Sequence, residues 1–209
     1  KKIIDNTAYP EWKRLEKQQF SKNDSWITYE INPLVGDGYL HRYEIASGKH
    51  DSLKRAKDAQ LDPNGQFIAW KVVPGFDTLR NCELNKVDKK KWPKDSLYIY
   101  LTASDSVIKI SKLKSFNVCE DASVLAYLSE VSQKSAPEVK KTWMQKHGFQ
   151  KEEKPAEKPK SDGHQLTVWT TTSTWTQKNV TKYSMPKNGK YIAIVTQQKL
   201  KNDSSQVRI

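Results

Sequence analysis

The stretch DPNGQFIAW, residues 62–70, places a tight turn directly before a short apolar strand that ends on an aromatic residue. Asn64-Gly65 are predicted to supply the positive φ that such a hairpin turn requires, because glycine reaches this conformation without steric cost. The apolar and aromatic run that follows favours a strand. The same pattern occurs forty-one residues earlier in SKNDSWITY, residues 21–29, where Asp24 takes the corresponding turn position. The chain therefore repeats a turn–strand motif.

Two further copies of this motif follow. The third lies in SFNVCEDASVLAYLSE, residues 115–130, and the fourth lies in KYSMPKNGKYIAIVTQ, residues 182–197, where Asn188-Gly189 form the turn. Both are predicted to carry two turn residues more than the first two copies. One apolar or aromatic residue leads into each copy: Phe20, Leu61, Phe116 and Tyr183. Four occurrences indicate a fold built from equivalent units.

A hairpin follows each of the first three copies. Residues 38–53, 96–110 and 165–180 alternate apolar and polar side chains around short polar turns, and residues 206–209 begin the pattern again. Each unit then has four antiparallel strands in about 40 residues, which is typical of a β-propeller blade. A single blade cannot bury both of its faces, so blades must stack. The sequence predicts an all-β, incomplete (open) β-propeller of about three to four antiparallel four-stranded blades, with a short N-terminal helix.

The spacing of the copies sets the predicted boundaries. Residues 1–17 form a helical lead-in, because YPEWKRLEKQ, residues 9–18, has Pro10 early and places Trp12 and Leu15 on one face. The blades are predicted at residues 18–56, 57–112 and 113–180, with a partial blade at residues 181–209.

Two insertions lengthen the spacing between copies, at residues 74–95 and 131–163. We expect the first to be a long hairpin or loop. The second is expected to hold a short helix at residues 137–146 and a disordered Lys/Glu/Pro tract at residues 150–163. Four aromatic residues are predicted to lie in the cores of the blades: Tyr29, Trp70, Tyr127 and Trp169.

Charge and hydropathy argue against several classes of partner. The net charge is +12, but the lysines gather in predicted loops, at residues 86–94 and 134–160, and no zinc finger, aromatic RNA-binding motif or phosphate-binding loop occurs. We therefore expect no nucleic-acid partner. No apolar run approaches the roughly 20 residues of a membrane-spanning helix. The chain opens on Lys1 without a signal peptide, and we expect a trimmed piece of a longer protein.

Cysteine and histidine residues show no metal-ligand spacing. Cys82 and Cys119 are expected to be ordinary thiols, and whether they form a disulfide stays open. The four histidines are scattered along the chain: His41, His50, His147 and His164. We expect no metal, no cofactor and no catalytic residue in this chain.

The ordered set of motifs resembles one family. QQFSKNDSWITYEINPLVGDGYLHRYEIASGK (residues 18–49), AQLDPNGQFIAWKVV (residues 59–73) and NVTKYSMPKNGKYIAIV (residues 179–195) are similar to the N-terminal propeller of prolyl oligopeptidase-type serine peptidases. The likeness is greatest to the large secreted bacterial members that resemble dipeptidyl peptidases. Within the first unit, NPLVGDGYL (residues 32–40) matches a familiar join. The resemblance runs from about Tyr9 to the C-terminus.

The resemblance implies a non-catalytic role for this chain. Such peptidases carry a C-terminal α/β-hydrolase domain with a G-x-S-x-G motif, which this chain lacks. Their propeller caps the active site and limits access to short peptides. Dipeptidyl members also use a pair of glutamates on the propeller, but Glu152-Glu153 lie in the Lys/Pro tract and do not take that role. The implied partners are the hydrolase domain and peptide substrates, in the periplasm or outside the cell.

Two other expectations concern binding. The alternative function is a free-standing TolB-like propeller that binds proteins or glycans. Independently, an open arc of blades leaves a face and a strand edge uncovered, and exposed apolar faces and unpaired edges favour association. We expect self-association with another copy, through the faces that carry Trp26, Trp70 and Trp169.

Overall fold

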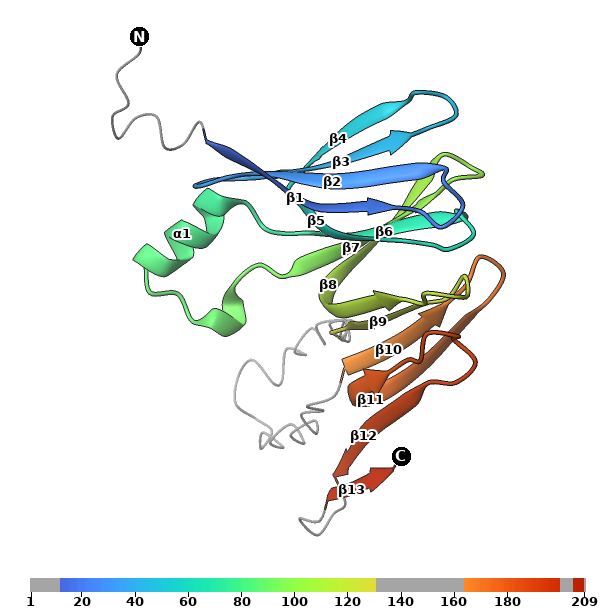
Figure 1. The fold of residues 1–209 in the computed structure, drawn as a ribbon. Coiled ribbons are helices and arrows are strands. Elements are labelled where there is room, and N and C mark those ends of the chain that lie inside the picture. Colours follow the sequence, from blue (N-terminus) through green and yellow to red (C-terminus); the bar gives the residue numbers. More distant parts are fainter. Residues whose placement is uncertain (1–11, 131–163, 200–204, 209) are drawn as a thin grey trace, which may run out of the picture.

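The computed structural model describes residues 12–130, 164–199 and 205–208, and these form a stack of antiparallel sheets that follow one another along an open arc (Figure 1). The first sheet contains four strands in the order β1-β2-β3-β4. Their bounds are β1 Lys13–Phe20, β2 Trp26–Pro33, β3 Tyr39–Glu44 and β4 His50–Lys54. This sheet is blade 1. Alternating side chains of β2 are buried and half-buried, as expected for a strand with one face on a core.

The other nine strands are hydrogen-bonded into one sheet in chain order. Their bounds are β5 Ala56–Leu61, β6 Phe67–Val72, β7 Asp95–Leu101, β8 Ser106–Val118, β9 Leu125–Ser129, β10 His164–Trp169, β11 Thr174–Ser184, β12 Ala193–Lys199 and β13 Ser205–Arg208. The sheet is continuous because two strands are unusually long. β8 pairs with β7 up to Leu113 and with β9 from there on, and β11 pairs with β10 up to Val180 and with β12 beyond it.

Each long strand therefore ends one blade and begins the next. Blade 2 comprises β5, β6, β7 and the first part of β8; blade 3 comprises the rest of β8, β9, β10 and the first part of β11; blade 4 comprises the end of β11, β12 and β13. The bends fall at Lys112 and Asn179, which have φ of +58° and +61°. Lys17 and Asp58, at +51° and +52°, mark bulges in the first strands of blades 1 and 2.

Three buried clusters hold the arc together, one between each pair of successive blades. The first joins Trp26 and Leu40 of blade 1 to Ile68, Trp70 and Tyr100 of blade 2. The second joins blade 2 to blade 3, and the third joins blade 3 to blade 4. Burial of each large side chain contributes about 1.5–3 kcal/mol relative to exposure. The predicted all-β class and the open arrangement of blades are confirmed, since the described strands do not close into a ring.

Two elements differ from the prediction. Residues 1–11 lie outside the described residues, but from Lys13 the predicted N-terminal helix is instead the strand β1. The sequence KRLEKQQF has the composition of a helix, yet pairing with the edge of β2 satisfies its backbone and overrides that weak preference. Within the insertion at residues 74–95, the predicted hairpin or loop contains the helix α1, Phe76–Leu84, followed by a 3₁₀ turn at Lys89–Lys91.

Helix α1 begins where the side chain of another blade accepts a backbone hydrogen bond. The amide of Phe76 donates to Asp37 Oδ1 at 2.8 Å, and Asp77 lies in the first turn. The helix buries none of its residues and projects from the arc (Figure 1). The insertion at residues 131–163, with its predicted helix and disordered tract, lies outside the described residues. Among the described helices, none is long and apolar enough to cross a membrane.

Candidate functional site

Three carboxamide side chains occupy equivalent positions in the first strands of successive blades. Gln19 of β1 and Gln60 of β5 are forty-one residues apart in the sequence. Asn117 of β8 takes the same position, because each of the three residues immediately precedes the apolar residue that ends its strand. These first strands adjoin one another along the inner side of the arc, since β1 contacts β5 and β5 contacts β8. The inner side of the arc therefore carries a row of amide groups.

Two of these carboxamides bind the backbone of the following blade. Gln19 Nε2 donates to the carbonyl of Ala59 at 3.1 Å, and Gln60 Oε1 accepts from the amide of Val118 at 2.6 Å. Each hydrogen bond joins the first strand of one blade to the first strand of the next. Both glutamines also line the cavity described next.

A cavity of about 280 Å³ lies beside this row of carboxamides. Its lining comes from all four blades: Gln19, Gln60, Leu61, Asn117, Val118, Cys119, Glu120, Met185, Pro186 and Lys187. The lining residues thus include three carboxamides, one carboxylate residue and one lysine, together with apolar residues such as Leu61, Val118 and Met185. Such a lining can hydrogen-bond to the backbone of an extended peptide.

The turns that follow the first strands form a second row, which we call the turn row (residues 21–26, 62–67, 119–124 and 186–191). Asn23 Nδ2 donates to the carbonyl of Asn64 at 3.2 Å, and Asn64 Nδ2 donates to Ser123 Oγ at 2.8 Å. The amide of Asp121 donates to the carbonyl of Lys187 at 2.9 Å. Each turn is therefore bonded to the next, which fixes the end of the cavity.

Cys119 is part of this row. Its thiol is buried and donates to the carbonyl of Lys187 at 2.6 Å. The equivalent residues in the first two turns cap their own turns instead: Ser21 Oγ accepts from the amide of Trp26, and Asp62 Oδ2 accepts from the amide of Gln66. Cys119 and Cys82 are both free thiols.

The predicted turn residues divide into two groups. Asp24, Gly65 and Gly189 have φ of +52°, +70° and +63°. Asn64 and Asn188 were also expected to have positive φ, but they are not among the described residues that do. Each asparagine lies immediately before the glycine that has the left-handed conformation. In the second copy the amide of Gly65 donates to the carbonyl of Asp62, so residues 62–65 form a four-residue turn with glycine in the last position.

The third turn is shorter than predicted. Phe20, Leu61 and Val118 pair with Ile27, Ile68 and Leu125, so the first three turns have the same length. In the fourth copy the strand pairing ends at Ser184 and Ala193, but the amide of Gly189 donates to the carbonyl of Pro186 as that of Gly65 does to Asp62, so the four-residue turn itself is the same. Val118, rather than Phe116, therefore leads into the third copy of the motif.

The four predicted core aromatics lie in different environments. Trp70 is buried between blades 1 and 2, while Tyr127 and Trp169 pack half-buried against the cluster between blades 2 and 3. Trp169 meets Phe67 edge to face, with ring centroids 5.2 Å apart. Tyr29 belongs to none of the described clusters. It stacks on His41 on the outer face of blade 1, at 4.9 Å between centroids.

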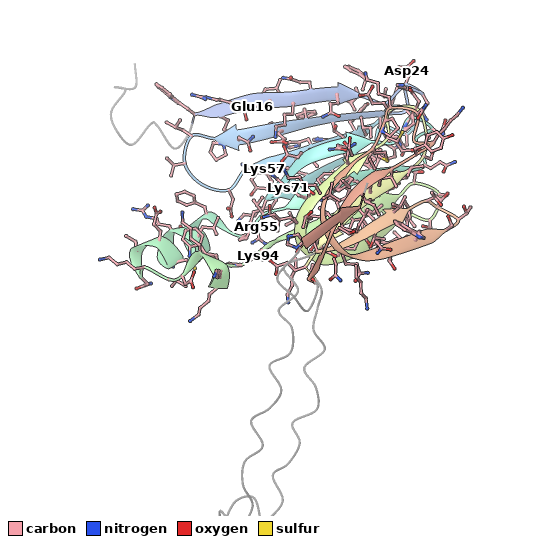
Figure 2. All side chains as sticks on the ribbon, turned by 90° about the horizontal axis from the view of Figure 1, so that it is seen from below. Glu16, Asp24, Arg55, Lys57, Lys71 and Lys94 are labelled. Atoms are coloured by element: carbon pink, nitrogen blue, oxygen red, sulfur yellow. The ribbon has the colours of Figure 1, made fainter. Side chains whose placement is uncertain are left out.

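Charged side chains gather at the end of the strands away from the turn row. Figure 2 shows Arg55, Lys57, Lys71 and Lys94 toward the side from which α1 projects, and Asp24 at the opposite end. Lys71 Nζ lies 2.5 Å from Asp58 Oδ2, and Lys17 also pairs with this carboxylate. Burial alone raises the pKa of Asp58, but hydrogen bonds and charge from the two lysines outweigh it and lower the pKa.

Glu30 joins blades 1 and 2 beside this charged group. Its carboxylate is 1% exposed. Oε1 accepts from the amide of Asp58 at 2.7 Å, and Oε2 accepts from Asn32 Nδ2 at 3.0 Å. Both oxygens are thus satisfied, which a buried carboxylate requires. Neither the carboxamide row nor Glu30 was identified from the sequence, although the forty-one-residue spacing of Gln19 and Gln60 could have shown the first.

Comparison with known proteins shows the fold and no family. No protein-family model matches the chain, and no curated protein sequence matches it. Among solved structures, a prolyl endopeptidase whose inter-domain dynamics were analysed in catalysis and specificity is similar at 9% identity, with a TM-score of 0.50. The match covers 93% of this chain and 29% of that one.

Two further structures are similar at lower scores. Prolyl oligopeptidase B from Galerina marginata matches at 10% identity over 96% of this chain and 32% of its own, with a TM-score of 0.49. The β-propeller domain of the Trilobed protease from Pyrococcus furiosus matches at 10% identity over 93% and 52%, with a TM-score of 0.48. The chain thus spans about a third to a half of the lengths of these proteins.

Proposed function

We propose that this chain is the propeller part of a serine peptidase of the prolyl oligopeptidase type, and that it carries out no bond chemistry itself. The observation that supports this most is the open arc of four-stranded blades with a polar cavity on its inner strands. The fold shared with a prolyl endopeptidase at a TM-score of 0.50 is consistent with it. The chain contains no G-x-S-x-G motif, so the nucleophile would lie in a separate α/β-hydrolase domain.

In this proposal the arc caps the active site of the hydrolase domain and restricts access to short peptides. The row of Gln19, Gln60 and Asn117 supports a path for peptides along the inner strands, because carboxamides both donate and accept hydrogen bonds. From the family resemblance we also propose a location in the periplasm or outside the cell, which cell fractionation would test.

The assignment to a peptidase is tested on the parent protein. A fluorophosphonate probe should label a serine outside these 209 residues, and the parent should cleave short Pro- or Ala-containing peptides. The 209-residue chain alone should neither react with the probe nor cleave these substrates. A parent without a hydrolase segment, or a probe-sensitive activity of the chain alone, would overturn the proposal.

The capping role is tested by loosening the contact between blades 1 and 2. In the parent, Trp70→Ala removes a side chain that is 2% exposed and should let longer polypeptides reach the active site. We expect the ratio of kcat/KM for a 30-residue peptide to kcat/KM for a dipeptidyl substrate to rise by about tenfold, because the capping arc would no longer exclude the longer peptide. The matched control is Leu84→Ala on the exposed surface of α1. An unchanged ratio in a folded Trp70→Ala variant would exclude capping by this arc.

A further inference from the structure

The first strands of blades 1, 2 and 3 each begin with a basic segment. The three segments are KRLEK at residues 13–17, KRAKD at residues 54–58 and SKLKS at residues 111–115. They hold eight basic residues against two acidic ones, so this part of the arc is strongly positive. We call five of their side chains the basic row: Arg14, Arg55, Lys57, Lys112 and Lys114.

The basic row follows the inner side of the arc, because β1 contacts β5 and β5 contacts β8. Figure 2 shows Arg55 and Lys57 at the end of the strands from which α1 projects, away from Asp24 in the turn row. Blades of a propeller stack face to face around a central channel. A further blade at either end of the arc would therefore cover a blade face and not this inner side.

The basic row lies at a constant separation from the carboxamides of the inner strands. Arg14, Arg55 and Lys112 each lie five residues before the carboxamide of the same strand. At about 3.3 Å per residue, five residues of a strand span roughly 15 Å. An extended peptide segment of about five residues that hydrogen-bonds to the carboxamides at one end would reach the basic row at its other end.

Two members of the basic row have a backbone conformation that their side chains do not favour. Arg55 and Lys112 have φ of +62° and +58°, and Asn179 has φ of +61° at the corresponding position of blade 4. Asparagine reaches the left-handed region more readily than residues with long side chains. The strain at Arg55 and Lys112 therefore points to a role for their charges.

The charges of the basic row are not neutralised within the fold. No ion pair among the described residues involves a member of the row, and the neighbouring carboxylate of Asp58 pairs with Lys17 and Lys71 instead. Arg55 and Lys57 are half-buried, so they have lost part of their hydration. A cation in this state is stabilised by a negatively charged ligand.

We infer that the basic row binds the carboxylate groups of acidic peptides that lie along the inner strands. A guanidinium group can donate two parallel hydrogen bonds to one carboxylate, and the lysines add positive charge. The three basic segments contain no aromatic residue, so they lack the stacking surfaces with which proteins bind the bases of single-stranded nucleic acids. The choice of a peptide as the ligand rests on the proposed function, but binding is measured without cleavage.

Binding of a labelled acidic peptide to the 209-residue chain tests the inference. The probe is a fluorescein-labelled peptide of about ten residues, long enough to span both rows, with four consecutive Glu among Ala, Gly and Pro. The matched peptide has Gln in place of each Glu. Fluorescence anisotropy should show that the Glu peptide binds at least about tenfold more tightly than the Gln peptide. This preference should shrink as the salt concentration rises from about 0.05 M to 0.5 M.

Two charge-matched double variants test the location of the site. Lys112→Gln with Lys114→Gln should raise the dissociation constant of the Glu peptide at least about tenfold, and Arg55→Gln should act in the same direction. Lys90→Gln with Lys91→Gln removes two charges from the 3₁₀ turn after α1 and should change the constant by less than about twofold. All four lysines are exposed, so both double variants should keep the circular dichroism of the wild type.

Equal binding of the Glu and Gln peptides, or an equal loss in the two double variants, would overturn the inference, since net charge alone would then attract the peptide. Tighter binding of a single-stranded DNA of about ten nucleotides than of the Glu peptide would overturn it as well. Selective binding by a chain whose parent has no hydrolase segment would refute the peptidase assignment and still support the site.

Discussion

At the scale of single residues, a few backbone conformations determine how neighbouring turns fit together. Gly65 has φ of +70°, and a Cβ atom there would collide with the side-chain amide of Asn23 in the preceding turn. Gly189 has φ of +63° and lies in the same way against Cys119 and Ala122. A glycine at these positions therefore serves both the turn and the close approach of the adjacent blade.

Gly65→Ala should lower the free energy of unfolding by about 1–2 kcal/mol from the left-handed backbone alone, and by more if Asn23 is displaced from Asn64. Urea denaturation measures the loss. In an Asn23→Ala background the steric part should vanish and leave only the backbone part. An equal loss in both backgrounds would mean that the two turns are not in contact.

His41 on blade 1 leads us to expect that the stability of the protein depends on pH. Burial, followed by the proximity of His50, lowers the pKa of His41 below 6.5. The ring of His41 stacks on Tyr29 of β2 and on His50 of β4, and Tyr43 of β3 lies beside His50. Because the unfolded chain then binds a proton more readily than the folded one, stability is full above pH 6.5 and falls as the pH drops through the lowered pKa.

We therefore expect the wild type to lose more stability between pH 7.5 and pH 5 than the variant His41→Asn, which cannot titrate at this position. Urea midpoints at the two pH values measure the difference. An NMR titration of His41 that gives a pKa above 6.5 would contradict the sign.

At the scale of the elements, periodic segments could be predicted and context-dependent ones could not. The strand β6 follows from FIAWKV after a tight turn, because local pattern and burial agree there. β1 could not be predicted from KRLEKQQF, since only the edge of β2 makes it a strand. Helix α1 was missed because FDTLRNCEL has no clear apolar periodicity, and its first amide is capped by the distant Asp37.

The candidate site was missed for a related reason. The carboxamides of Gln19, Gln60 and Asn117 have no chemistry that distinguishes them in the sequence, and they become neighbours only when the first strands of the blades adjoin. The turn glycines, in contrast, can be recognised in the sequence, because the positive φ of a tight turn is a local requirement that glycine meets without steric cost.

Glu30 provides a test of the contact between blades 1 and 2. Glu30→Ala leaves the amide of Asp58 without its acceptor and should destabilise the protein by about 1–3 kcal/mol. Glu30→Gln retains an acceptor oxygen of similar size and should cost less. Thermal unfolding compares the two variants, and equal losses would show that the hydrogen bond to Asp58 does not contribute.

At the scale of the whole molecule, the central claim is that the four copies of the motif are successive blades of one arc. The contact between the third and fourth turns tests this without reference to function. A Cβ atom placed on Gly189 would lie 3.6 Å from the Cβ of Cys119, within the range that disulfides require. These two positions are separated by seventy residues in the sequence.

The most direct measurement is the mapping of disulfides by mass spectrometry in the variant Gly189→Cys after mild oxidation. The account predicts a disulfide between Cys119 and the introduced cysteine, and no such bond when Cys119→Ser is added. An introduced cysteine that stays reduced, or that pairs with Cys82 on α1, would contradict the packing of the fourth blade against the third.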